Sequence, residues 1–242
     1  MIPARWKVSD NWRRLLAELV VIAVGVGIAL AVDNWNETRK ERIAEREYLN
    51  GIATDLEASA RSLQQTLASA RENRAAIERL IAIAEGAPPG DARELAGDLV
   101  LATYLGLPRM TTITFEELVS TGSLRLLRDA EFKRALAEML EAFRYGTQWY
   151  DNYRRIEYIT EVALRGLAPI ELRTDGWVAL DQPEVLARFD SDAVVAALRA
   201  DEGLVPKLED SVWTQARAMM LAQSQLERIA ELQAMLREMD LD

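Results

Sequence analysis

The chain has 242 residues and contains neither cysteine nor histidine, which excludes disulfides, thiol nucleophiles, zinc sites of the usual kind and Ser-His-Asp catalysis. Acidic residues outnumber basic ones by 39 to 29. The excess lies after residue 35, where 25 basic and 36 acidic side chains give a net charge of −11, so nucleic acid is not an expected partner.

The first expected element is a membrane span. Residues 15–32 read LLAELVVIAVGVGIALAV and would cover roughly 27 Å as a helix, close to the thickness of a hydrocarbon core. Trp12 and Trp35 bracket this run like an interfacial aromatic belt. A cleaved signal peptide is the alternative, since 29–31 offers an A-x-A site, but the length of the run and the charge of Glu18 favour an uncleaved anchor. We therefore expect a tail at 1–14, a transmembrane helix at 15–35 and a soluble helical body at 36–242.

Basic residues beside the run indicate its orientation. Arg13 and Arg14 abut it on the N-terminal side, whereas Arg39 is the first basic residue beyond it. Because basic residues gather on the cytoplasmic side, the pattern predicts a single-pass protein of a bacterial inner membrane. Its N-terminus would be cytoplasmic and its C-terminal body periplasmic.

The span carries candidate packing residues for a second helix. Ala23, Gly27 and Ala31 recur every four residues, and Gly25 begins a parallel row of small side chains. Glu18 lies about one turn inside the basic flank, where it can pair with a neighbouring arginine, reach the interface or act as a functional intramembrane carboxylate. The shallow position favours the first two readings.

A long amphipathic helix is expected from 36 to 85, and it can continue the span without a break. An apolar stripe repeats every seven residues, and a second set of apolar residues widens it. Ser59, Thr66 and Asn73 interrupt this stripe, which favours packing within its own bundle over a dry seam between two chains. The repeat consists of Leu49, Leu56, Leu63, Ala70, Ile77 and Ala84, and the widening set is Ile52, Leu67, Leu80 and Ile81.

Shorter elements and two more long helices follow. The stretch 86–90 ends the first helix, and Asp91 predicts the N-cap of a helix over 91–106. The sequence TFEE at 114–117 reads as a capping box for a short helix that Gly122 stops. Asp129 predicts the cap of a helix to about residue 164, and a final helix runs to about 239. Its expected stripe is Val212, Met219, Leu226 and Leu236, with Leu208, Ala222 and Ile229 alongside.

Two clusters are candidate binding patches. Trp149, Tyr153 and Arg154 belong to the densest aromatic stretch, which reads either as a ligand or partner pocket or, more commonly at this spacing, as bundle core. Arg125 and Arg128 flank two leucines and can bind an anion or pair with Asp129, Glu131 or other carboxylates of the following helix. We favour core packing for the first cluster and ion pairing for the second.

Two stretches resemble an uncharacterised family of short, single-span bacterial membrane proteins. The first opens with Glu18, contains Gly25 and closes with DNWNE at 33–37, where the family has an N-N-W-N-E-like sequence. The second is TFEELVSTGSLRLLR at 114–128, which is similar to a family core motif. The resemblance implies a membrane anchor followed by a helical domain, and it brings no known activity, cofactor or catalytic residue.

Together these observations predict an all-α protein, with one transmembrane helix followed by an antiparallel helical bundle of long amphipathic helices. The leading hypothesis is a membrane-anchored, non-enzymatic interaction or scaffold protein that uses no cofactor and binds a protein partner or its own copy. The alternative is a periplasmic ligand-sensing bundle that signals through a partner protein. A hydrolase with a carboxylate-only metal site is a third hypothesis, for which no residue is nominated.

Overall fold

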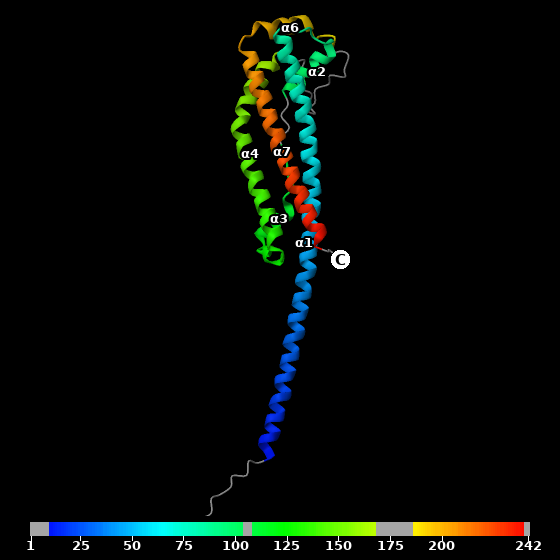
Figure 1. Cartoon of the computed structure of the whole chain (residues 1–242), viewed down its shortest axis with the longest axis vertical. Coiled ribbons are helices and arrows are strands. Elements are labelled where there is room, and N and C mark those ends of the chain that lie inside the picture. Colours follow the sequence, from blue (N-terminus) through cyan, green and yellow to red (C-terminus); the bar gives the residue numbers. More distant parts are fainter. Residues whose placement is uncertain (1–9, 104–107, 168–185, 240–242) are drawn as a thin grey trace, which may run out of the picture.

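A computed structural model describes residues 10–103, 108–167 and 186–239, and every regular element in these ranges is helical (Figure 1). The all-α prediction is therefore confirmed for the described part of the chain. Residues 177–180, whose short apolar sequence also suits a strand, lie outside the described residues. The elements are α1 (Asp10–Ala84), α2 (Ala92–Ala102), α3 (Ile113–Ser120), the 3-10 helix η1 (Ser123–Leu126), α4 (Ala130–Arg165), α6 (Ser191–Ala200) and α7 (Leu204–Glu238).

Helix α1 is one unbroken helix of 75 residues, which corresponds to about 112 Å. Its lower part projects from the body as a free rod, while its upper part runs along the whole body (Figure 1). The free part contains an 18-residue window with a mean hydropathy of 2.7, and none of that window is buried. The helix is thus long and apolar enough to cross a membrane, and the expected continuity between the apolar run and the amphipathic helix is confirmed.

Three long helices, α1, α4 and α7, form the body, with α7 packed against both of the others. Helix α7 runs antiparallel to α1, since its C-terminal residues pack beside the start of the α1 stripe. The α1 stripe faces this partner helix, as predicted for a bundle. Its buried members alternate by three and four residues: Leu49, Ile52, Leu56, Ser59, Leu63, Thr66, Ala70, Asn73, Ile77 and Leu80.

The predicted stripe of α7 is partly wrong. Val212, Met219 and Leu226 are only half-buried, and polar side chains occupy several of the buried positions instead. A hydrophobicity pattern does not detect polar residues in a core, so the sequence placed the stripe about one residue away from the observed row. That row again alternates by three and four: Leu208, Ser211, Gln215, Ala218, Ala222, Gln225, Ile229, Leu232 and Leu236.

The body has two hydrophobic clusters along the α1–α7 seam. The proximal cluster, nearer the apolar run, joins α1 residues 49–63 to α4, α7 and the 118–132 segment around Phe132. The distal cluster joins α1 residues 77–83 to α2, α6 and the start of α7. Between them the seam narrows to small and polar side chains, among them Thr66, Asn73, Ser211 and Gln215, all buried.

Aspartate side chains cap the N-termini of α2, α4 and α6. Asp91 makes a reciprocal capping box with Glu94, and Asp129 accepts a hydrogen bond from the Phe132 amide, so both predicted N-caps are confirmed. Asp190 caps α6 in the same way. Helix α2 ends at Ala102, earlier than the predicted 106. The chain leaves α3 through Gly122 at φ 70°, a left-handed conformation that favours glycine.

The predicted capping box at 114–117 is wrong in its register. Helix α3 begins at Ile113, and its N-cap, Thr112, makes no side-chain cap bond. The amide of Thr114 is instead bound by a carboxylate of α1, Asp55. An acceptor that is 59 residues away in the sequence has replaced the local cap.

Candidate functional site

The segment 110–129, which we call the corner, is held against the part of α1 where that helix enters the body. Ser59 is completely buried, and its hydroxyl accepts a hydrogen bond from the Thr111 amide at 2.9 Å and donates one to the Thr111 carbonyl at 3.4 Å. One short side chain therefore satisfies both backbone groups of a corner residue. This explains why a polar residue occupies that position of the α1 stripe.

Two further contacts continue the docking one and two turns lower. The Asp55 carboxylate accepts a hydrogen bond from the Thr114 amide at 2.8 Å. Gly51 lies opposite the same threonine, and a Cβ atom built on it would come within 2.9 Å of the Thr114 side chain. The absence of a side chain at Gly51 allows the corner to approach the α1 backbone closely.

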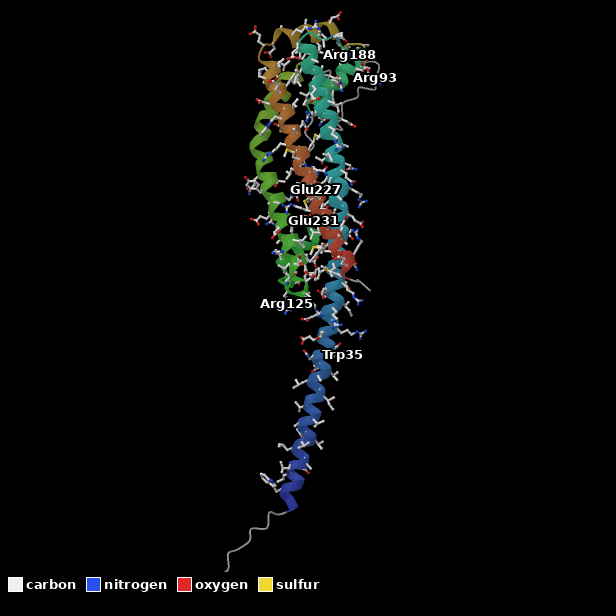
Figure 2. The ribbon with its side chains drawn as sticks, viewed as in Figure 1. Trp35, Arg93, Arg125, Arg188, Glu227 and Glu231 are labelled. Atoms are coloured by element: carbon white, nitrogen blue, oxygen red, sulfur yellow. The ribbon has the colours of Figure 1, made fainter. Side chains whose placement is uncertain are left out.

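The lowest contact of the corner involves Arg128, one of the predicted patch residues. Glu45 accepts a hydrogen bond from the Arg128 amide at 2.7 Å, and its other oxygen lies 3.3 Å from the Arg128 Nε. The expected pairing with Asp129 or Glu131 does not occur, because α1 supplies the carboxylate. Arg125 is exposed at the lower end of the body, above Trp35 on the free part of α1 (Figure 2).

A cleft of about 470 Å³ opens beside this contact, and we call it the basal cleft. Three arginines line it, two from α1 and one from the corner. It lies where α1 leaves the body toward the apolar run. Its lining residues are Arg42, Glu45, Arg46, Leu49, Arg128, Asp129 and Met239.

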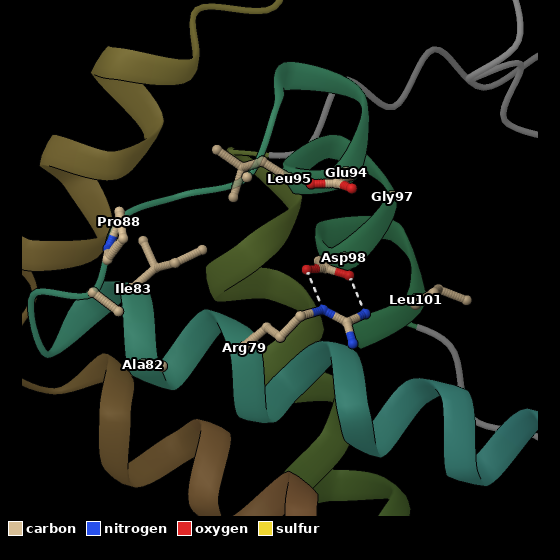
Figure 3. A pocket seen from close by; sticks show the side chains of 11 residues that line it. Arg79, Ala82, Ile83, Pro88, Glu94, Leu95, Gly97, Asp98 and Leu101 are labelled. Atoms are coloured by element: carbon tan, nitrogen blue, oxygen red, sulfur yellow. Dashed lines mark hydrogen bonds and ion pairs between the residues drawn. The ribbon is translucent and has the colours of Figure 1, made fainter.

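A second cleft, of about 560 Å³, lies at the opposite end of the body between α1 and α2 (Figure 3). In it, Arg79 and Asp98 form a two-bond ion pair with N–O distances of 2.9 and 2.6 Å. The Asp98 hydrogen bond raises the pKa of Arg79 above its ordinary value, so this guanidinium stays charged. The Asp98 side chain is 10% exposed and that of Arg79 is 56% exposed.

The polar groups of this distal cleft serve the fold. Glu94 is used in the capping box of α2, and Asp98 is used by Arg79. Nearby, Arg199 of α6 donates to the carbonyl of Ile83, in the last turn of α1, and to the carbonyl of Ala87, three residues beyond the helix. The first bond engages a carbonyl at a helix end, where intrahelical donors run out. The polar contacts in and beside the distal cleft therefore join α1 to α2 and α6.

The span candidates lie on the free part of α1. Glu18, Ala23, Gly25, Gly27 and Ala31 are all exposed. A Cβ atom built on either glycine would meet nothing within 4 Å. The body of the same chain thus leaves the rows of small residues uncovered.

The aromatic patch lies on α4, but the side chains of Trp149, Tyr153 and Arg154 are outside the described residues. Just below them, Gly146 faces α7 so closely that an added Cβ atom would lie 2.6 Å from Leu221. Within the described ranges, no group of three or more carboxylates is arranged to hold a metal ion.

Within the ranges that the structure describes, every regular element is helical and one helix is long and apolar enough to cross a membrane. The chain belongs to a family of unknown function, DUF6090, whose model matches residues 18–155. This match begins at Glu18, includes the corner and stops inside α4, so it leaves out α6 and α7. The resemblance to an uncharacterised family is confirmed, and neither the curated proteins nor the solved structures contain a match to this chain.

Proposed function

We propose that the protein is a membrane-anchored, non-enzymatic interaction protein whose helical body is held close to a bacterial inner membrane. The observation that carries the proposal is the unbroken α1, in which an apolar window with none of its surface buried continues directly into the core of the body. Apolar surface of this extent needs a cover, and lipid supplies one for a rod of this length. The rows of small residues on the same rod support close approach by a second helix.

The anchor is tested by extraction. Membranes of cells that produce the full chain should keep it after washing with alkaline carbonate and release it with detergent. Release by carbonate would overturn the anchor. A periplasm-active reporter fused to the C-terminus should be active, and a reporter active only in the cytoplasm would overturn the proposed orientation.

The interaction is tested by crosslinking in cells, followed by mass spectrometry. We expect crosslinks between copies of the chain or to another membrane protein, and we expect Gly27→Leu to reduce them because it fills the small-residue row. Val26→Leu adds bulk about 100° around the same helix from Gly27, outside both rows of small residues, and is the control. A strictly monomeric chain with no crosslinked partner would overturn the proposal.

A ligand-sensing bundle that signals through a partner is the second candidate. The small and polar middle of the α1–α7 seam favours it, because such a layer buries less apolar surface than the two hydrophobic clusters and opens at a lower cost in free energy. A ligand screen by thermal stability, repeated with Trp149→Phe and Arg154→Gln, tests this function. Ligands whose stabilising effect disappears in both variants would support it.

A further inference from the structure

The basal cleft contains two arginines, Arg42 and Arg46, that form no ion pair with any residue that the structure describes. Its two carboxylates are already used, because Glu45 binds Arg128 and Asp129 caps α4 through the Phe132 amide. In the described part of the chain, no ion pair involves Arg42 or Arg46. Two guanidinium groups therefore line one cleft without a carboxylate partner among the described residues, in a body whose overall charge is negative.

The position of the cleft relative to the apolar run limits what can reach it. Arg42 and Arg46 lie seven and eleven residues beyond Trp35, or about 10 and 16 Å along the helix. Side chains on a helix lean toward its N-terminus, so both arginines of α1 lean toward the run. Headgroups occupy about 5–7 Å on each side of a hydrocarbon core, so the cleft opens just above them.

We propose that the basal cleft binds a phosphate group, with Arg42 and Arg46 as the ligating residues. Guanidinium groups bind phosphate through paired charge-assisted hydrogen bonds, and two of them on one face can hold a single phosphate. Arg128, fixed by Glu45, forms the opposite wall. The phosphate can come from the headgroup of an anionic phospholipid or from a soluble phosphate. Only the lipid source rests on the proposed membrane anchor.

The body has a net charge of −11, which repels phosphate from most of its surface. Specific binding in the basal cleft can therefore be distinguished from nonspecific electrostatic attraction. If phosphate were attracted only by nearby positive charge, its binding would depend on all the basic residues just beyond the run. If it binds in the basal cleft, its binding should depend on Arg42 and Arg46. Arg39 and Lys40 carry the same charge on the same helix, closer to the run and outside the cleft lining, and they provide the matched control.

The experiment uses the purified full-length chain in a neutral detergent. Native mass spectrometry compares binding of phosphatidylglycerol with that of phosphatidylcholine, and calorimetric titration measures binding of inorganic phosphate. The double variant Arg42→Gln/Arg46→Gln should weaken binding of the phosphate probe by about tenfold or more, and Arg39→Gln/Lys40→Gln should weaken it far less.

Two positive outcomes distinguish the sources. A preference for phosphatidylglycerol that the cleft variant abolishes assigns the phosphate to a lipid, whereas cleft-dependent binding of inorganic phosphate without lipid preference assigns it to a soluble anion. Equal losses in both double variants, or no binding of either probe, would overturn the proposal. Because the titration is done in detergent, its result is independent of whether carbonate extraction supports the membrane anchor.

Discussion

The two ends of the body are attached to α1 by different chemistry. At the end near the apolar run, side chains of α1 accept hydrogen bonds from backbone amides of the corner: Ser59 from Thr111, Asp55 from Thr114 and Glu45 from Arg128. At the distal end, α1 is joined by arginine side chains, through the pair of Arg79 with Asp98 and through Arg199.

Because of this difference, we expect the two ends of the body to respond differently to the loss of a bonding partner on α1. A backbone amide cannot rotate away to find another acceptor, so losing its α1 partner leaves a donor without a bond. A half-exposed arginine can turn to water, and its ion pair is screened by salt. We therefore expect the proximal contacts to fix one geometry firmly and the distal contacts to adjust at lower cost.

The substitution that we expect to destabilise the chain most tests whether the two ends of the body unfold together. Phe132 is completely buried in the proximal cluster, and Phe132→Ala should destabilise the chain by about 3–5 kcal/mol through the cavity it leaves. Because α1 and α7 run through both clusters, we expect one unfolding transition, with amides at both ends losing protection together. Urea titration in detergent, followed by circular dichroism and hydrogen exchange, measures both.

The matched variant at the other end is Leu99→Ala, which removes a side chain completely buried in the distal cluster. It should shift the same single transition by about 2–5 kcal/mol. Loss of protection confined to the end that carries the substitution would show that the polar middle of the seam separates two independent units.

The second effect isolates a docking bond of the corner. Ser59→Ala removes the acceptor of the Thr111 amide and should cost about 1–3 kcal/mol, because that partly buried donor loses its partner. Thr66→Val is the control, since the Thr66 hydroxyl bonds only to the Ser62 carbonyl one turn back. We expect the control to lie close to wild type in urea titration. Equal losses would mean that the hydroxyl at Ser59 contributes nothing beyond its place in the seam.

Much of the fold could be predicted, because local chemistry determined it. The seven-residue repeat of α1, the caps at Asp91 and Asp129 and the stop at Gly122 each depend on residues within one or two turns. The capping box predicted at 114–117 was wrong because the bond that forms there is not local. The Thr114 amide is satisfied by Asp55, and no short window of sequence contains both residues.

The candidate site was harder to predict for the same reason. Arg128 was recognised as a charge that needs a partner, but Glu45 lies 83 residues earlier and became its partner only through folding. Ser59 is a polar residue within the apolar stripe, and this interruption is the signal in the sequence that the corner binds α1 there. The basal cleft gave no signal, because Arg42 and Arg46 read as ordinary charges on an amphipathic helix.

The third effect is at the distal ion pair. Asp98→Asn should cost about 1 kcal/mol, above the value of a fully exposed pair because the aspartate is mostly buried, and high salt should reduce the difference. The pKa of Arg79 is raised in the folded chain, so its contribution is fully present below the ordinary arginine pKa and is lost only as the pH rises through the raised value. Titration of Arg79 should thus leave stability unchanged from neutral to mildly alkaline pH. A loss of stability in that range that disappears in the variant would contradict this assignment.

The smallest effect compares one helical glycine from each end. Gly97 of α2 has open space around a built Cβ atom, so Gly97→Ala should stabilise the chain by about 0.5–1 kcal/mol through the reduced freedom of the unfolded chain. Gly51→Ala in α1 reduces the freedom of the unfolded chain by the same amount. However, its Cβ atom would lie 2.9 Å from the Thr114 side chain, and Asp55 holds the amide of that threonine in place. The corner must then shift, so the gain should vanish or reverse in urea titration. An equal gain at both positions would mean that the corner adjusts as easily as the distal end, and the contrast between firm and adjustable attachment would not hold.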